Sequence, residues 1–121
     1  MKTAYASVKP YITRDGSQIR ELMHPAQNAA RGNRAQSFAE AIVERGRKTA
    51  LHRHHVTEEI YHITQGTGLM TLGTQNFVVG AGDTICIAPG TAHCIECVGE
   101  AALKILCACA PAYAHEDTEL L

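Results

Sequence analysis

The sequence predicts an all-β fold, either a sandwich or a barrel of short strands, on two observations. The segments FVVG (77–80), DTICIA (83–88) and ALKILCAC (102–109) are rich in Val, Ile, Thr and Cys, which favour strands over helices. Turn signals such as Asp15-Gly16 and Pro89-Gly90 recur between such segments instead of gathering in one place. Short strands at regular spacing are typical of a sandwich or barrel.

Length and composition limit the classes of function. The 121 residues are the size of one domain, and 45% hydrophobic with 19% charged residues is typical of a globular protein. A formal net charge of -1 gives no electrostatic basis for binding nucleic acid or anionic lipid. No apolar run has the length of a signal peptide or a membrane span, so we expect a cytoplasmic protein without a membrane partner. In that reducing compartment the five cysteines are expected to be thiols.

The segment RAQSFAEAIVERGRK (34–48) carries competing signals. Its Ala, Glu and Arg residues favour a helix, whereas Ser37, Ala39, Ala41 and Val43 alternate with larger or charged residues as in a strand. The neighbouring segments are predicted strands, and a glycine ends this one within the typical length of a strand. We therefore predict a strand here.

The stretch LHRHHVTEEIYHITQG (51–66) contains four of the seven histidines beside two adjacent glutamates. Alternate residues of an extended strand share a face, so His52 and His54 point one way while Arg53 and His55 point the other way. The strand therefore presents two imidazoles together.

After a short turn the chain resumes as a strand in which Glu59 and Tyr61 share one face, while Glu58 and His62 take the opposite face. If the two strands are adjacent, one of the two glutamates adds an oxygen to the pair of nitrogens. Imidazole with carboxylate suits Fe, Mn, Co, Ni, Cu or Zn better than Mg or Ca, which prefer oxygen ligands. The alternative is an exposed edge strand that charged and imidazole side chains protect against aggregation.

Two segments share a pattern of spaced glycines and histidines. The first runs as a glycine, five residues, His-x-His, four residues, a glutamate, six residues and a glycine, at Gly46, His52, His54, Glu59 and Gly66. The second runs as a glycine, five residues, x-Pro-Gly, two residues and a histidine, at Gly82, Gly90 and His93. The pattern resembles the two motifs of the cupins. It departs from them at Ala88, where proline is usual, and at Cys97, where asparagine is usual.

The resemblance implies an antiparallel jelly-roll β-barrel as one domain over residues 1–121, with the motif-bearing core at 46–97. It also implies a metal inside the barrel, with four ligands: His52, His54, Glu59 and His93. Glu59 is preferred to Glu58 because the six-residue gap and the strand parity both select it. The implied cofactor is one divalent transition metal per chain, Fe, Mn, Ni or Zn. The implied assembly is a homodimer.

A metal with open coordination positions leads us to expect an enzyme with a small-molecule substrate. The first hypothesis is a dioxygenase or related oxidoreductase. The alternatives are a Lewis-acid isomerase, epimerase or lyase acting on a sugar or hydroxy acid, and a non-catalytic sugar-binding cupin, since fold does not choose among them. Tyr61 and Met70 are candidates to line the cavity, and Arg20 is a candidate to bind an anionic group of the substrate.

Two cysteine pairs, Cys94 with Cys97 and Cys107 with Cys109, suggest a competing, sulfur-rich zinc or redox site. The odd separation of Cys94 and Cys97 places them on opposite faces of a predicted strand, and C-x-x-C redox chemistry usually requires a helix N-terminus. We therefore expect these thiols to be small buried hydrophobic residues. By the same parity, His55 and His62 are expected to face away from the metal.

Overall fold

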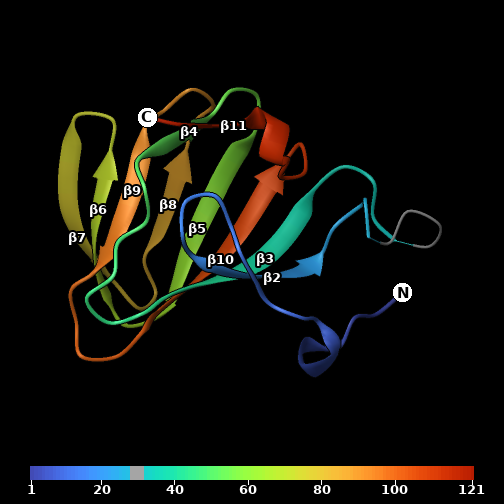
Figure 1. Ribbon diagram of the computed structural model, residues 1–121, viewed down its shortest axis with the longest axis horizontal. Coiled ribbons are helices and arrows are strands. Elements are labelled where there is room, and N and C mark those ends of the chain that lie inside the picture. Colours follow the sequence, from blue (N-terminus) through green and yellow to red (C-terminus); the bar gives the residue numbers. More distant parts are fainter. Residues whose placement is uncertain (28–31) are drawn as a thin grey trace.

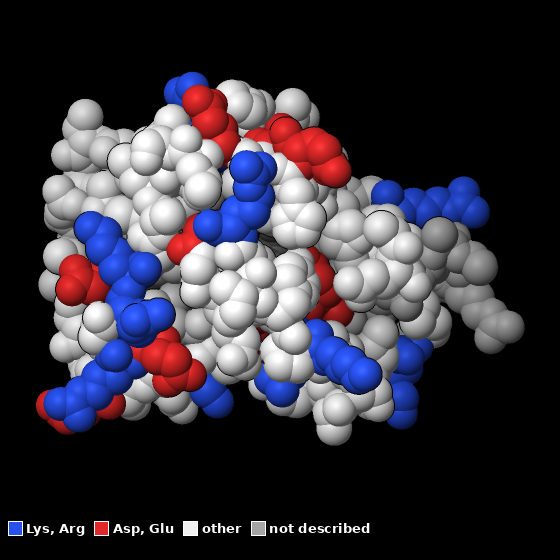
Figure 2. Space-filling view, in the orientation of Figure 1, with Lys and Arg blue, Asp and Glu red and all other residues white. Residues whose placement is uncertain are grey.

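The computed structural model describes residues 1–27 and 32–121 and confirms the predicted antiparallel jelly-roll β-barrel (Figure 1). Two sheets face one another and enclose the interior. On the face shown in Figure 2, basic and acidic side chains are interspersed rather than gathered into an area of one sign. Nowhere in the described residues is there a helix long and apolar enough to cross a lipid bilayer.

All neighbouring strands of both sheets pair antiparallel. In the larger sheet the described strands follow the order β1 (Tyr11–Ile12), β2 (Gln18–Met23), β3 (Ser37–Val43), β10 (Leu103–Ala110), β5 (Glu58–Gln65) and β8 (Thr84–Ile87). In the smaller sheet they follow the order β11 (Thr118–Leu120), β4 (His52–His54), β9 (His93–Cys97), β6 (Thr67–Leu72) and β7 (Gln75–Gly80). The 3-10 turns are η1 (Tyr5–Ser7) and η2 (His115–Asp117).

The segment with competing helical and strand signals forms β3, as predicted. It pairs with β2 on one side and with β10 on the other, so tertiary pairing outweighs the helical propensity of its Ala and Glu residues. Ser37, Ala39, Ala41 and Val43 are buried, as the alternation predicted. Three of these inward side chains are small, so β3 leaves space inside the barrel.

The core fills the rest of the interior. The largest fully buried apolar side chains are Ile63, Met70, Ile87, Ile95, Leu103 and Ile105. Gly68 lies among them, and a Cβ there would come within 3.1 Å of both Ile95 and Leu103. Gly66, the last glycine of the first motif, turns the chain between β5 and β6 with a φ of 88°. A side chain at Gly66 would press on a backbone carbonyl at 2.8 Å, so glycine is required there, whereas a side chain at Gly68 would require Ile95 and Leu103 to shift.

The histidine strand β4 and the glutamate strand β5 belong to opposite sheets. β4 pairs with β9 and β11, whereas β5 pairs with β8 and β10. The two strands are therefore not neighbours, contrary to the adjacency that we considered from the sequence. Their side chains converge across the barrel interior instead.

Candidate metal centre

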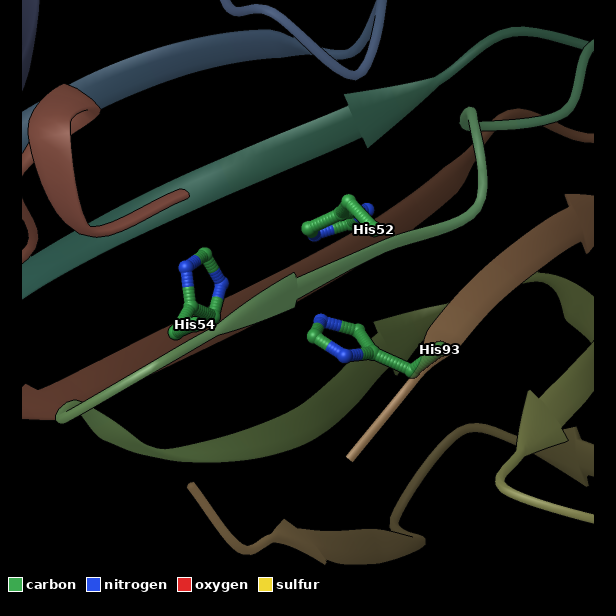
Figure 3. Close-up of side chains that lie close together, drawn as sticks. All are labelled: His52, His54 and His93. Carbon is green, nitrogen blue, oxygen red and sulfur yellow. The ribbon is translucent and has the colours of Figure 1, made fainter. Parts of the chain in front are cut away.

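Three buried histidines converge inside the barrel (Figure 3). His52 and His54 point inward from β4, and His93 points toward them from the start of β9. One ring nitrogen from each histidine can be chosen so that all three lie within 4.8 Å of one another. The ring centroids of His52 and His93 are 4.2 Å apart. This arrangement can present three nitrogen ligands to one ion.

The hydrogen bonds of Nδ1 fix the tautomers of two of these rings. His52 Nδ1 lies 2.7 Å from the carbonyl oxygen of Ala50, and His93 Nδ1 lies 2.9 Å from that of Thr91. A carbonyl oxygen only accepts, so each Nδ1 carries the hydrogen and donates it. Nε2 of each neutral ring then holds a lone pair that faces the cavity, which is the state in which histidine binds a metal.

His54 reaches the same state through a hydroxyl group. Its Nδ1 lies 2.9 Å from Oγ1 of Thr118, and that hydroxyl donates its own hydrogen to the carbonyl oxygen of Ala114 at 3.1 Å. Thr118 Oγ1 therefore accepts from His54 Nδ1. β11, which pairs with β4 in register at these two residues, thus orients a ring of the cluster.

Glu59 faces the histidines from β5. Its Oε1 lies 3.3 Å from His54 Nε2 and 3.5 Å from His93 Nε2. Glu59 Oε1 and His93 Nε2 are buried without a hydrogen-bond partner among the described residues. Buried lone pairs facing one another repel unless a cation lies between them. The three histidines therefore fit a divalent transition metal, and Glu59 Oε1 lies beside two of them as a possible carboxylate ligand.

Electrostatics favour the protonation states that metal binding needs. Burial opposes ionisation of Glu59, but His54 and His93, when they carry a hydrogen on Nε2 in the metal-free protein, donate to its carboxylate, which outweighs burial and lowers its pKa to about 2. Burial, followed by the proximity of His93, lowers the pKa of His52. A charged carboxylate beside neutral imidazole is the donor set that binds divalent metals. The neighbouring Glu58 is exposed.

Cys109 holds the other oxygen of Glu59. Its thiol donates to Glu59 Oε2 at 3.3 Å from the facing position of β10. Burial, and then the charge of Glu59, raise the pKa of Cys109, so the thiol keeps its hydrogen. Oε1 is thereby left for the histidine side of the site.

The other predicted candidates lie in different places. Tyr61 lines the cavity, with its ring centroid 6.1 Å from that of His93. Met70 is fully buried in the hydrophobic core and does not line the cavity. Arg20 packs over the ring of Tyr5 at 4.5 Å on the outer side of the barrel. It is outside because β2 turns its neighbours Ile19 and Glu21 inward.

No cysteine belongs to the group of possible metal ligands found among the described residues. All five cysteines are free; Cys107 and Cys109 line the cavity, whereas Cys94 and Cys97 do not. Cys97 instead belongs to the hydrophobic core, as expected for a small buried residue. His55 and His62 are exposed and point away from the cluster, where His55 contacts Glu119 at 3.0 Å.

The chain ends supply further cavity residues, although the sequence favoured solvated terminal segments over terminal residues that touch substrate. Glu21 is buried and lines the cavity, and its Oε1 accepts a hydrogen bond from the Tyr11 hydroxyl at 3.0 Å. Its Oε2 is buried and has no hydrogen-bond partner in the described part of the chain. Burial raises the pKa of Glu21. The sequence feature that could have indicated this is the alternation of β2, in which Glu21 shares a face with the apolar Ile19. Asp15 and Tyr113 also line the cavity.

Comparison with known sequences places the chain in a family. Residues 39–109 match the family described as the cupin domain, which is more than half of the chain and includes all four candidate ligands. The chain is a cupin. An uncharacterized protein of Methanocaldococcus jannaschii, MJ1618, is 57% identical to this cupin over 121 residues, covering 100% of this chain and 94% of the relative.

Solved structures share the fold of this cupin at low sequence identity. A predicted oxalate decarboxylase of Thermotoga maritima has a TM-score of 0.77 at 22% identity, covering 92% of this chain and 99% of that one. Pac13, a nucleoside dehydratase from Streptomyces, has a TM-score of 0.77 at 17% identity, covering 100% of this chain and 90% of that one. These similarities support the cupin barrel and leave the reaction to the residues of the site.

Proposed function

We propose that this cupin is an enzyme that binds one divalent transition metal and acts on a small molecule in the barrel cavity. The ligands are His52, His54, Glu59 and His93, and the metal is Fe, Mn, Ni or Zn. The convergent Nε2 lone pairs and the unpartnered Glu59 Oε1 support this proposal. When bound, the metal would act as a Lewis acid that polarises an oxygen of the substrate.

Glu21 is the observation that favours proton-transfer chemistry. It lines the same cavity as the histidines, and its Oε2 is buried without a partner. Burial raises its pKa, so its carboxyl group is protonated at higher pH than an exposed glutamate. A protonated Oε2 would donate to a substrate hydroxyl and could transfer its proton as that group leaves.

Neighbouring residues support this role of Glu21. The Tyr11 hydroxyl holds Oε1 at 3.0 Å and so fixes the orientation of the carboxyl group. Ala39 and Ala41 keep the adjacent wall small and apolar, which leaves room for a substrate and limits water near Glu21. We therefore favour a lyase or isomerase acting on a hydroxylated small molecule over the dioxygenase hypothesis, because dioxygen chemistry does not require a protonated carboxyl group in the cavity.

The dioxygenase and non-catalytic hypotheses make different predictions for one set of assays. Protein reconstituted with Fe, Mn, Ni or Zn is incubated with sugars, hydroxy acids, enols and thiols, and substrate loss and oxygen uptake are both recorded. We expect substrate loss without oxygen uptake. Oxygen uptake with iron alone would support the dioxygenase, and absence of any turnover with every metal would support a binding protein.

Glu21→Gln and Glu58→Gln test whether Glu21 transfers a proton in the reaction. Glu58 is exposed on β5 and serves as a matched control for loss of one carboxylate. We expect Glu21→Gln to reduce turnover by about a hundredfold with unchanged metal content. Glu58→Gln is expected to leave turnover unchanged. Equal turnover in both variants would remove the proton-transfer argument.

We also propose that a second copy of the chain packs on the outer face of the larger sheet. Phe38, Ala108, Ile60 and Cys86 face one another in register across β3, β10, β5 and β8. Phe38 and Ile60 are 40% and 39% exposed and lie on either side of Ala108, so they form one apolar row on the sheet surface. Light scattering should give the mass of a dimer, and Ile60→Glu should give a monomer.

A further inference from the structure

The turn between β1 and β2 brings a second carboxylate to the histidine cluster. Asp15 lies in this turn and lines the same cavity as the histidines. Its Oδ2 lies 3.6 Å from Nε2 of His52, and its side chain is only 13% exposed. Glu59 and Asp15 thus contact the cluster at different histidines, Glu59 at His54 and His93 and Asp15 at His52.

The turn fixes the orientation of Asp15. Its Oδ1 accepts hydrogen bonds from the hydroxyl groups of Thr13 and Ser17 and from the backbone N–H of Ser17. Its backbone carbonyl accepts from the N–H of Ala50 at 2.7 Å, just before β4. Oδ1 is therefore saturated with donors, while Oδ2 is the oxygen left to face His52.

The contact between Asp15 and His52 joins two acceptors. The hydrogen of the neutral His52 ring is on Nδ1, where it is donated to Ala50, so Nε2 has no hydrogen for Asp15 Oδ2. The 3.6 Å separation is close to the 3.5 Å between Glu59 Oε1 and His93 Nε2. Asp15 Oδ2 thus faces His52 Nε2 at a separation that two ligands of one metal ion can have. We propose that Asp15 is a further metal ligand, an inference that rests on the proposed metal site.

A ligand at Asp15 would change the net charge of the metal site and would connect the site to the C-terminal segment. A divalent ion with two carboxylates is neutral, whereas with Glu59 alone it keeps a positive charge. Arg14, next to Asp15, donates to the carbonyl oxygens of His115 and Thr118 at 3.2 Å and 3.1 Å. Thr118 in turn orients His54. Metal binding through Asp15 would therefore tie the turn at 13–17 to the C-terminal segment beside the cavity.

Asp15→Asn tests the proposal through metal affinity. Asparagine keeps Oδ1 as an acceptor for Thr13 and Ser17, so the turn is retained while the charge is lost. Asp83→Asn is the matched control, since Asp83 also holds a turn, through Gly80 N–H at 2.8 Å, and does not line the cavity. In chelator competition with Zn²⁺ or Co²⁺, Asp15→Asn should bind about tenfold or more weakly than wild type and Asp83→Asn. Equal affinities of all three proteins would overturn the proposal.

Hydrogen exchange provides a readout that does not depend on affinity. Saturating Zn²⁺ should slow amide exchange of residues 13–17 in wild type and in Asp83→Asn, but not in Asp15→Asn. Equal protection in Asp15→Asn would show that the turn does not contact the metal. If wild type itself binds no metal, the proposed function fails and this inference fails with it. If wild type binds metal and Asp15→Asn is indistinguishable from it, only the inference about Asp15 is wrong.

Discussion

The Cys109 thiol donates a hydrogen bond to Oε2 of Glu59 at 3.3 Å, across the facing register of β10 and β5. The two residues are fifty positions apart in the sequence, and their contact decides which carboxylate oxygen remains for the histidines. A residue that looks like a small buried hydrophobe thereby takes part in the site by orienting a ligand.

This contact predicts that Cys109→Ala weakens metal binding by about tenfold, because Glu59 loses the donor that holds it. Cys109→Ser keeps a hydroxyl donor and should retain most of the affinity. Cys94→Ser is the control, since Cys94 is buried but does not line the cavity. Affinities are measured by chelator competition. Loss of metal from Cys94→Ser would instead revive the sulfur-rich site.

His54→Ala and His93→Ala should each strongly reduce metal content, because each removes one of three nitrogen ligands. Both variants should still fold, since the large apolar side chains of the core do not depend on the metal. His62→Ala is the control, as His62 is exposed and contacts Thr84. Metal analysis and circular dichroism check both statements. Full metal occupancy in both cavity variants would place the site elsewhere.

Glu59→Gln should lower metal affinity while Glu58→Gln leaves it unchanged. The two residues are adjacent in the sequence, but only Glu59 faces the histidines, at 3.3 Å from His54. Loss of its charge removes one carboxylate ligand, and the affinity should fall by about a hundredfold. Isothermal titration with Zn²⁺ measures both variants. A larger loss of affinity in Glu58→Gln would mean that Glu58, and not Glu59, is the ligand.

The pH dependence of stability should report on Glu21. Its pKa in the folded chain is raised by burial above the ordinary value of 4.5, so its contribution to stability is present below that value. The contribution is lost as pH rises through the raised pKa, because the folded state then holds a buried charge. Glutamine does not ionise, so the Glu21→Gln variant does not lose stability in this way. Compared with Glu21→Gln, metal-free wild type should therefore become relatively less stable as the pH rises above 4.5 and through the raised pKa of Glu21.

Urea unfolding of both proteins, with a chelator present, measures that difference. The control is Glu58→Gln, whose stability relative to wild type should not change in this way, since Glu58 is exposed. A difference between wild type and Glu21→Gln that is constant with pH would mean that Glu21 has an ordinary pKa.

Strand parity predicted which side of each strand faces the site. The alternation of β4 and β5 places His52, His54 and Glu59 inside and His55 and Glu58 outside, as the structure has them. This works because side chains of a strand alternate with a period of two, independent of where the strand pairs. The small residues of β3 followed the same rule and leave the cavity open.

The pairing of strands that are distant in the sequence could not be predicted from strand parity. Local patterns do not specify that β4 and β5 lie in opposite sheets, or that β11 supplies Thr118 to His54. The sequence indicated only that Asp15 lies in a turn, because its approach to His52 depends on how the N-terminal hairpin packs. Arg20 could have been placed outside, since parity within β2 turns Ile19 and Glu21 inward.

We propose that four side chains inside the barrel hold a transition metal. Elemental analysis compares wild type, purified without added metal or an affinity tag, with His93→Ala. We expect about one transition-metal ion per chain in wild type and far less in His93→Ala. Wild type that carries no metal and takes up none when Fe, Mn, Ni or Zn is supplied would contradict it.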